Sequence, residues 1–453
     1  MEELRIIALT GLLGYGYRIQ SLRNGVELEP HLIGADNGST DPGPYYLGSG
    51  QQLTKPAQVK RDLGPALIEA RRLGIPLVIG SAGTAGGEPH LQAVTDVVHE
   101  IAREQRLHFR LAVIHAELSK SLLSDALASG RLHALPGAPT VSSETIASTE
   151  RLVGQMGPEP FVAALESGAD VVIAGRSCDT AIYAAMPQMH GYDIGLAFHM
   201  AKIMECGAQC AIPLAANDSL LGTLRRDHFL VQPLDLSRTV TPESVAAHAM
   251  YEQGNPFEIV EPGGRVDLTN ATYEQVDSRT VRVAGSKWVR SPTYTIKVEG
   301  AARRGYATIA VAGARDPAIL ANLRTIEMEA LRATESNLDG VLDPNSYTLR
   351  MRVYGRDGVL GALEPTPMEI GHEVGIVLEA IATSQEEADH ALALLRSSVL
   401  HCPFVGRKTT AGNLAFPYSP SDIRVGPVYE FSVYHLLDVD HPLDLFPVEY
   451  IDV

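Results

Sequence analysis

Two polar segments, each following a predicted strand, carry the side chains best suited to acid–base chemistry. Residues 36–43 read DNGSTDPG, and residues 175–180 read GRSCDT. A carboxylate at such a position could transfer a proton, and Arg176 could bind a substrate carboxylate through two parallel hydrogen bonds. Cys178 is less suited to a nucleophilic role, because the sequence pairs no particular histidine with it. We therefore predict catalytic roles for Asp36 and Asp179 and substrate-binding roles for Ser39, Asp41, Arg176 and Cys178.

Both segments also have a purely structural interpretation. The Asp, Asn and Ser side chains of residues 36–43 could cap the backbone of their own loop. Arg176 and Asp179 could form a salt bridge that closes the start of a helix. For the first segment the sequence favours neither interpretation over the other.

A glycine-rich segment, SAGTAGG at residues 81–87, lies between a predicted apolar strand and a predicted helix. Small residues at a helix N-terminus let backbone N–H groups approach a phosphate or carboxylate. The segment is neither a Walker A loop nor a dinucleotide-binding fingerprint. The alternative is a tight turn needed only for packing of the helix against the sheet. We predict substrate-binding roles for Ser81, Gly83, Thr84 and Gly86.

A histidine and a glutamate follow the strand predicted at residues 109–114, where the chain reads His115-Ala116-Glu117. Alternation along a strand places the His115 and Glu117 side chains on one side, an arrangement suited to general acid–base catalysis. The alternative is a hydrogen-bonded pair that orders the loop. The helix predicted at 193–210 places His199 and Cys206 on one face, with Cys210 nearby, but packing explains such a helix more simply than a metal does. No metal ligand is predicted.

Apolar strands alternate with helices through the first half of the chain. This pattern predicts an α/β domain with a parallel sheet and helices on both of its faces, and ligands bind such sheets beyond the carboxyl ends of the strands. After residue 230, short strands of alternating polarity and two helices predict an α+β domain with mainly antiparallel strands. The predicted domains are residues 1–230, 231–420 and a tail at 421–453. The predicted helices are 56–73, 89–103, 144–168, 193–210, 316–333 and 385–400.

Composition narrows the classes of partner. The chain has 453 residues and a net charge of −17, so neither nucleic acid nor an anionic membrane surface is an expected partner. Its four cysteines are irregularly spaced, which argues against a disulfide framework. There is no signal-peptide pattern and no apolar run of about 18 residues, the length of a membrane span. We therefore expect a cytoplasmic protein that binds a small anionic substrate.

Several segments resemble the acyclic terpene utilisation family typified by AtuA. They are residues 168–209, which include Gly175, Arg176, Asp179, His199 and Glu205-Cys206-Gly-Ala-Gln209, and residues 241–256 and 291–301. The resemblance extends from residue 1 to about residue 420. Residues 35–48 depart from the family pattern and indicate a separate branch. The tail at 426–439 is similar to a small companion domain that often accompanies the family.

The resemblance implies the breakdown of branched acids as coenzyme A thioesters. It favours a hydratase or lyase that acts on a small carboxylic acid or its acyl-CoA thioester, with coenzyme A entering as part of the substrate. In this scheme the glycine-rich segment and Arg176 hold the anion, and either His115 with Glu117 or Asp36 with Asp179 moves protons. We also expect a homo-oligomer or a complex with a small companion subunit.

The sequence leaves two other functions open. One is a metal-assisted hydrolase with Asp36, His115 and Asp179 as ligands of a divalent metal. The other is a non-catalytic subunit of a catabolic complex, for which the tail would supply the contact with a partner.

Overall fold

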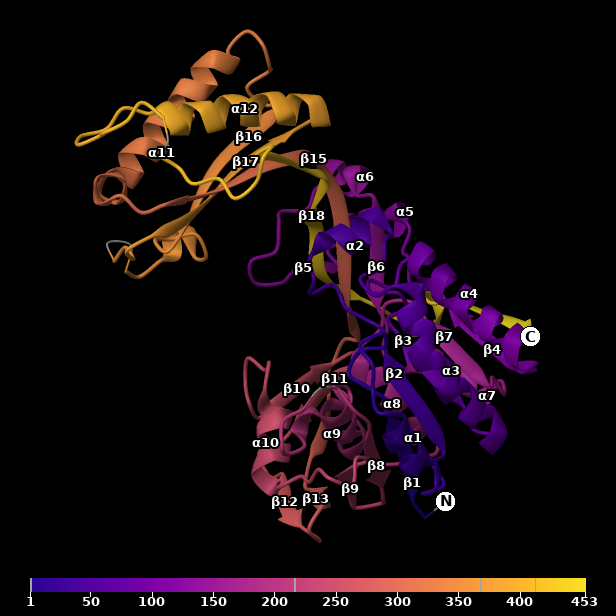
Figure 1. Ribbon diagram of the computed structural model, residues 1–453. Helices are drawn as coiled ribbons and strands as arrows, with labels where there is room; N and C mark the ends of the chain where they lie inside the picture. The colour runs from indigo at the N-terminus through magenta and orange to yellow at the C-terminus, as the bar shows by residue number, and fades with distance from the viewer. Residues whose placement is uncertain (1, 216, 367–368, 412) are drawn as a thin grey trace. The chain divides into compact units, whose positions relative to one another are not determined.

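The computed structural model describes residues 2–215, 217–366, 369–411 and 413–453, which divide into two units (Figure 1). The first unit comprises residues 1–302 and 431–453, and the second comprises residues 303–430. The boundary predicted at residue 230 falls within the first unit, and the boundary predicted at residue 420 falls within the second.

Five parallel strands form the centre of the main sheet of the first unit. Their order is β1-β2-β3-β7-β4, and every neighbouring pair is parallel. These strands are almost entirely buried, as expected where helices cover both faces of a sheet. The predicted parallel α/β arrangement is confirmed. The strands are β1 (Leu4–Ala8), β2 (Leu32–Asp36), β3 (Leu77–Gly80), β4 (Arg110–Ile114) and β7 (Val171–Ala174).

Antiparallel strands extend this sheet at both edges. Four of them follow β1 in the order β8-β9-β13-β12, and β19 pairs with β4 at the opposite edge. Because these strands continue the sheet of the first unit, no separate domain begins at residue 231. The strands are β8 (Leu220–Leu224), β9 (His228–Pro233), β12 (Thr272–Gln275), β13 (Val281–Ala284) and β19 (Val448–Asp452).

The side chains of the central strands alternate between two hydrophobic cores. Ile6 and Val78 pack on one face with α8 and α9, whereas Ile7 and Ile79 pack on the other with α1, α3 and α4. Among the described residues, no helix combines the length and apolar character that a membrane crossing requires. The helices named are α1 (Ile19–Val26), α3 (Pro56–Leu73), α4 (Glu88–Gln105), α8 (Asp179–Met189) and α9 (Ile194–Met204).

A strand interrupts residues 144–168, which the sequence predicted as one helix. The segment contains α6 (Ser143–Ser148), β6 (Arg151–Gln155) and α7 (Glu159–Glu166). Gly154, Gly157 and Pro158 disfavour a continuous helix here, since glycine and proline are the poorest helix formers. β6 pairs antiparallel with the first part of β15 (Thr295–Ala314), with Gln155 opposite Lys297. This pairing fixes the stretch of β15 that carries Lys297 and Glu299.

Smaller elements complete the first unit. β10, β11 and β14 form a separate three-stranded antiparallel sheet, and a 3-10 turn (Gly207–Cys210) follows α9. The elements are α2 (Pro44–Ser49), α5 (Lys120–Ala128), β5 (Leu132–Ala134), α10 (Pro242–Met250), β10 (Glu258–Glu261), β11 (Gly264–Asp267) and β14 (Lys287–Arg290).

The second unit is an antiparallel sheet with two helices on one face (Figure 1). Its strand order is β16-β17-β15-β18, and β17 pairs antiparallel with both β16 and β15. The chain order βαββαβ with this strand order is the split βαβ arrangement of ferredoxin-like domains. The predicted antiparallel α+β region is confirmed. The elements are β15, α11 (Pro317–Leu338), β16 (Tyr347–Tyr354), β17 (Val374–Ala382), α12 (Gln385–His401) and β18 (Asp422–Asp438).

Candidate functional site

Asp36 ends β2 at the carboxyl edge of the parallel sheet, where it is only 4% exposed. Its Oδ2 atom accepts a hydrogen bond from the Gly38 N–H at 3.1 Å. Its Oδ1 atom is buried and has no hydrogen-bond partner among the described residues. Burial and the nearby charge of Asp179 raise the pKa of Asp36 well above its usual range. Asp36 is therefore suited to hold a proton at neutral pH.

Two further buried oxygen atoms at the same edge of the sheet lack partners within the described residues. They are the Ser177 Oγ atom, just after β7, and the Tyr183 hydroxyl of α8. Glycines make room for both: a Cβ on Gly80 would lie 2.6 Å from Ser177 Oγ, and one on Gly34 would lie 2.7 Å from the Tyr183 ring. Buried polar atoms are nearly always hydrogen-bonded in proteins, so this cluster indicates that a polar ligand or water completes the site.

Asp179 is the first residue of α8 and is partly exposed. The positive end of the helix dipole favours a carboxylate there. Burial nevertheless raises the pKa of Asp179, and the positive charges of Arg176 and Lys202 oppose that rise only in part. The structure thus brings the two predicted catalytic aspartates close enough for their charges to interact, one on a strand end and one on a helix start.

Arg176 does not pair with Asp179 as the structural interpretation supposed. Its Nε atom donates to Glu299 Oε2 at 2.8 Å, and Lys297 Nζ lies 2.7 Å from Glu299 Oε1. The Thr40 hydroxyl also donates to Glu299 Oε1, at 2.6 Å. Burial alone would raise the pKa of Glu299, but Arg176 and Lys297 lower it to about 2. Glu299 is therefore ionised and holds Arg176 in place. The Nε atom of Arg176, which was predicted to help bind a substrate carboxylate, is already bonded to Glu299.

The sequence did not single out Glu299 or Lys297, although both belong to this network. Glu299 is fully buried, and the residues next to it in β15, Val298 and Gly300–Ala302, are small or apolar. A charged residue at an inward-facing position of such a strand is uncommon unless it is paired, and that was the available signal.

Most backbone N–H groups of the glycine-rich segment are hydrogen-bonded within the protein and are not free to bind an anion. Asn37 accepts two of these N–H groups: that of Gly83 at Oδ1 and that of Thr84 at the backbone oxygen. The Ser81 N–H donates to Gly175 O, and the Gly86 N–H donates to Ala82 O. The Thr84 hydroxyl accepts a hydrogen bond from the Leu53 N–H. These contacts contradict the prediction of an N–H cradle and support the packing interpretation.

Ser81 nevertheless touches the site. Its Oγ atom accepts hydrogen bonds from Arg176 Nη1 and the Ser177 N–H, both at 3.3 Å. Its φ of 43° is unusual for a residue other than glycine, and such strained backbone clusters at functional sites. Ser81 therefore positions Arg176.

Replacing Gly86 with alanine is expected to destabilise the first unit by about 2–5 kcal/mol. Gly86 has a φ of +66°, and a Cβ would lie 2.1 Å from the Arg176 backbone nitrogen. Left-handed backbone costs about 1–2 kcal/mol for alanine, and forced backbone shifts add about 1–3 kcal/mol. The matched control is Gly130→Ala, because Gly130 has a φ of +72° with nothing within 4 Å of its Cβ. Urea unfolding followed by the fluorescence of Trp288 compares them, and equal losses would contradict the steric argument.

A second group of buried ionisable side chains adjoins Asp179. Lys202 Nζ lies 2.5 Å from Glu205 Oε1, and the charge of Asp179 contributes to the pKa of Glu205. Burial raises the pKa of Glu205 to about 8 against the attraction of Lys202, and burial likewise raises the pKa of Glu261 to about 8. Burial, Glu261 and Asp179 raise the pKa of Cys178 well above its usual range, so Cys178 is a thiol and a poor nucleophile. Glu261 was not among the residues predicted from the sequence.

The raised pKa of Glu261 predicts that stability falls as the pH rises from about 5 to 8. In the unfolded chain this carboxyl loses its proton near pH 4.5, whereas the folded protein holds the proton to about pH 8. The folded state therefore binds more protons across this window, and each step up in pH favours unfolding. Glu261→Gln should reduce this slope in urea unfolding measured at several pH values. Part of the slope should remain, because Glu205 also has a raised pKa. An unchanged slope would contradict the assigned pKa.

A cavity of about 560 Å³ adjoins the Glu299 network within the first unit. Tyr434 forms part of its wall, and the Lys297 ammonium lies 4.8 Å from the centre of that ring. Thr40 links the cavity directly to Glu299. Volumes of this size are typical of small-molecule sites. The lining residues are Thr40, Asp41, Pro136, Gly137, Pro139, Phe431 and Tyr434.

Ser39 and Asp41, predicted to bind substrate, bond to each other in the structure. The Ser39 hydroxyl donates to Asp41 Oδ2 at 2.9 Å, and the Asp41 N–H donates back to Ser39 Oγ at 3.2 Å. This local cap matches the structural interpretation of their segment. Asp41 still borders the cavity and is exposed.

His115 and Glu117 do not form the predicted acid–base pair. His115 Nδ1 lies 2.9 Å from Glu88 Oε1, and its Nε2 lies 3.9 Å from Glu449. Glu117 instead pairs with Arg151 at 2.5 Å and accepts the Glu88 N–H. Both residues therefore hold the start of α4, and they do not form the hydrogen-bonded pair of the structural alternative either.

Within the described ranges, the residues considered as metal ligands form no complete ligand set. Among the described residues, no cluster of three or more His, Cys, Asp or Glu side chains is arranged to hold a metal ion, and Asp36, His115 and Asp179 form no such set. His199 is fully buried between the hydroxyls of Ser286 and Tyr273, and burial lowers its pKa to about 3. Cys206 contacts the Tyr251 hydroxyl.

A comparison with protein families gives a match over both units. The model described as acyclic terpene utilisation family protein AtuA matches residues 56–217 and 230–412. The chain belongs to this family. The match confirms the resemblance and includes Arg176, Asp179 and Glu299, whereas Asp36 lies before the first matched residue. No curated protein and no solved structure matches the chain.

Proposed function

We propose that this AtuA-family protein is a catabolic enzyme that transfers protons on a branched carboxylic acid or its acyl-CoA thioester, as a hydratase or lyase of acyclic terpene utilisation. The family description gives the metabolic context. The observation that carries the chemistry is Asp36, a nearly buried carboxyl with a free oxygen beside a second, partly exposed carboxyl, Asp179. Such neighbouring carboxyls are suited to act as acid and base.

The two aspartates take different roles because their surroundings differ. Asp36 is the more deeply buried and holds its proton, so it acts as the general acid. Asp179 is partly exposed at a helix start and lies close to Arg176 and Lys202, so it is the more easily ionised and acts as the general base. In hydration of an α,β-unsaturated thioester, Asp179 takes a proton from water as the oxygen bonds to the β-carbon. Asp36 then gives its proton to the α-carbon.

The cations of the site stabilise the charge that develops on the thioester oxygen. Arg176 is fixed by Glu299 and Ser81, and a positioned cation in a dry site stabilises a developing oxyanion strongly. The cavity bordered by Thr40, Asp41 and Tyr434 supplies space for the branched chain. Its aromatic and proline lining suits an aliphatic group better than a polar one.

The test is an isotope assay on the purified full chain. Branched saturated and α,β-unsaturated acyl-CoA thioesters, and the free acids, are incubated with the protein in D₂O and followed by mass spectrometry. We expect deuterium at the α-carbon or the gain of one water. A protein that leaves every compound unchanged, with and without added divalent metal, would contradict the proposal and favour a non-catalytic subunit. Turnover only with added metal would favour the metal-assisted hydrolase.

A further inference from the structure

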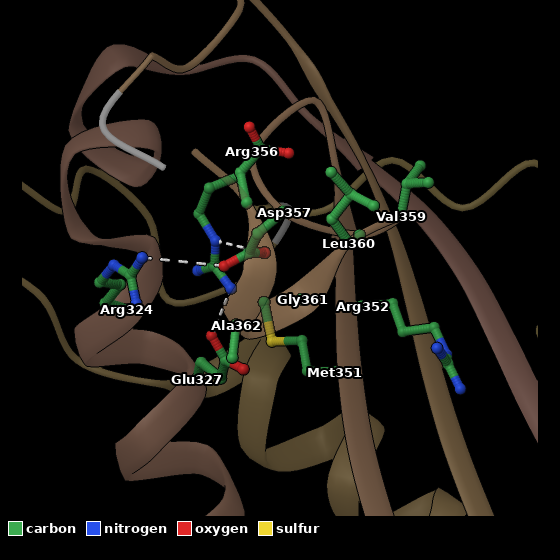
Figure 2. Close-up of a pocket in the computed structure, with 12 residues that line it drawn as sticks. Arg324, Glu327, Met351, Arg352, Arg356, Asp357, Val359, Leu360, Gly361 and Ala362 are labelled. Atoms are coloured by element: carbon green, nitrogen blue, oxygen red, sulfur yellow. Dashed lines mark hydrogen bonds and ion pairs between the residues drawn. The ribbon is translucent and has the colours of Figure 1, made fainter. Parts of the chain in front are cut away.

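The second unit contains a cavity of its own, of about 650 Å³, between α11 and the segment that follows β16 (Figure 2). Its volume is within the range of small-molecule sites. All of its lining residues belong to the second unit, so it is separate from the candidate site of the first unit.

Arg356 forms the polar centre of this cavity. Its side chain is only 3% exposed, with Nε bonded to Asp357 at 2.8 Å and Nη2 bonded to Glu327 at 2.6 Å. Its remaining nitrogen, Nη1, is buried without a hydrogen-bond partner in the described part of the chain. Two carboxylates thus hold the guanidinium in a fixed orientation and leave one donor unpaired. A buried donor of this kind calls for an acceptor oxygen.

Arg324 supplies a second, freer cation. It is 58% exposed and lies 3.8 Å from Asp357, the same carboxylate that Arg356 contacts, and the two guanidinium groups approach Asp357 together in Figure 2. The third lining carboxylate, Glu364, accepts hydrogen bonds from the N–H and hydroxyl of Thr366. Each of the three carboxylates thus has a hydrogen-bond or ion-pair partner, whereas the buried Nη1 of Arg356 has none among the described residues.

Apolar side chains form the opposite wall. Val359 and Leu360 are 82% and 50% exposed, and Figure 2 shows both on the side of the cavity away from α11. Exposed aliphatic residues next to convergent polar groups mark binding sites more often than random surface. A ligand that satisfies both walls has an anionic end and an aliphatic end.

We infer that this cavity binds a small amphiphilic anion, in which a carboxylate or a phosphate is joined to a short aliphatic chain. The anionic group lies between Arg324 and Nη1 of Arg356, and the aliphatic chain lies against Val359 and Leu360. This second ligand site is independent of proton transfer in the first unit, and it exists whether or not that proposal holds.

Calorimetric titration of the complete chain tests the chemistry. The probes are octanoate and octyl phosphate, with uncharged octanamide as the control ligand. One charged probe should bind, and Arg324→Gln should weaken that binding by about tenfold, the loss expected for one charge-assisted hydrogen bond. Arg332→Gln is the matched control, because Arg332 is an exposed arginine of the same helix paired with Glu329, outside the cavity lining. Equal effects of the two variants, or equal binding of octanamide, would overturn the inference.

Photolabelling locates the bound ligand without any substitution. A diazirine derivative of octanoate, irradiated with the full chain and mapped by peptide mass spectrometry, should label residues 351–364 or α11, and excess octanoate should suppress that label. Labels confined to residues 1–302 and 431–453 would place the anion in the first unit and overturn the second site. Retention of the label in Asp36→Asn would show that it does not depend on the proposed catalytic site.

Discussion

Replacing Glu299 with glutamine is expected to lower the free energy of unfolding of the first unit by about 3–5 kcal/mol. Glu299 is fully buried and contacts Arg176 at 2.8 Å and Lys297 at 2.7 Å. Glutamine keeps the shape of the side chain but removes its charge, which leaves two neighbouring cations without their shared anion. Losing one member of a buried ion pair costs far more than the pair itself contributes, because an uncompensated charge stays out of water.

Urea unfolding followed by Trp288 fluorescence measures this loss. Trp288 is the one tryptophan of the chain and stacks on Phe198 with 5.1 Å between ring centres, so its signal reports on the first unit. Glu100→Gln is the control, since Glu100 is an exposed partner of Lys60 and such pairs contribute at most about 1 kcal/mol. A Glu299→Gln protein as stable as the control would mean that the network does not hold Arg176.

The Asp36→Asn variant is expected to lose about 10²–10⁴-fold in turnover while its fold is retained. Asparagine has nearly the same shape and can still accept the Gly38 N–H, but it cannot donate and regain a proton in the reaction. Because burial already disfavours the charged form of Asp36, the neutral amide should not destabilise the protein. The isotope assay measures turnover, and the urea midpoint measures stability.

Asp96→Asn provides the comparison for this variant. Asp96 is an aspartate of α4 that accepts a hydrogen bond from Gln92 on an exposed surface, so its loss should leave turnover unchanged. If Asp36→Asn kept full turnover, Asp36 would not be the acid, and the proposed mechanism would be wrong. A loss of turnover with an equal loss of stability would instead assign Asp36 a structural role.

The sequence predicts the part of the site that depends on local patterns. Apolar runs mark the parallel strands, and the carboxyl ends of neighbouring parallel strands meet at one edge of a sheet. Asp36 at the end of β2 and Arg176 and Asp179 after β7 are therefore brought to one edge of the sheet as predicted, because β3 alone separates the two strands. The polar character of these strand ends is visible without any knowledge of long-range contacts.

The sequence does not predict the partners that arrive from far along the chain. Glu299 lies 123 residues from Arg176 along the chain. It reaches the site because β15 pairs with β6, a strand in a segment that was predicted to be helical. His115 lacks its predicted partner, Glu117, for a related reason. Glu449, near one of its ring nitrogens, belongs to β19, whose position beside β4 has no local sequence signal.

The placement of β19 has a consequence for handling the protein. Residues 448–452 pair with β4, and the N–H and C=O groups of Phe109 and Val453 bond to each other. Shortening the chain by these few residues would uncover a row of unsatisfied backbone groups along β4. Such a row is a template on which strands of other molecules assemble. Truncated protein should therefore self-associate and precipitate at concentrations at which the full chain stays dispersed, even though no residue of the proposed catalytic site has been removed.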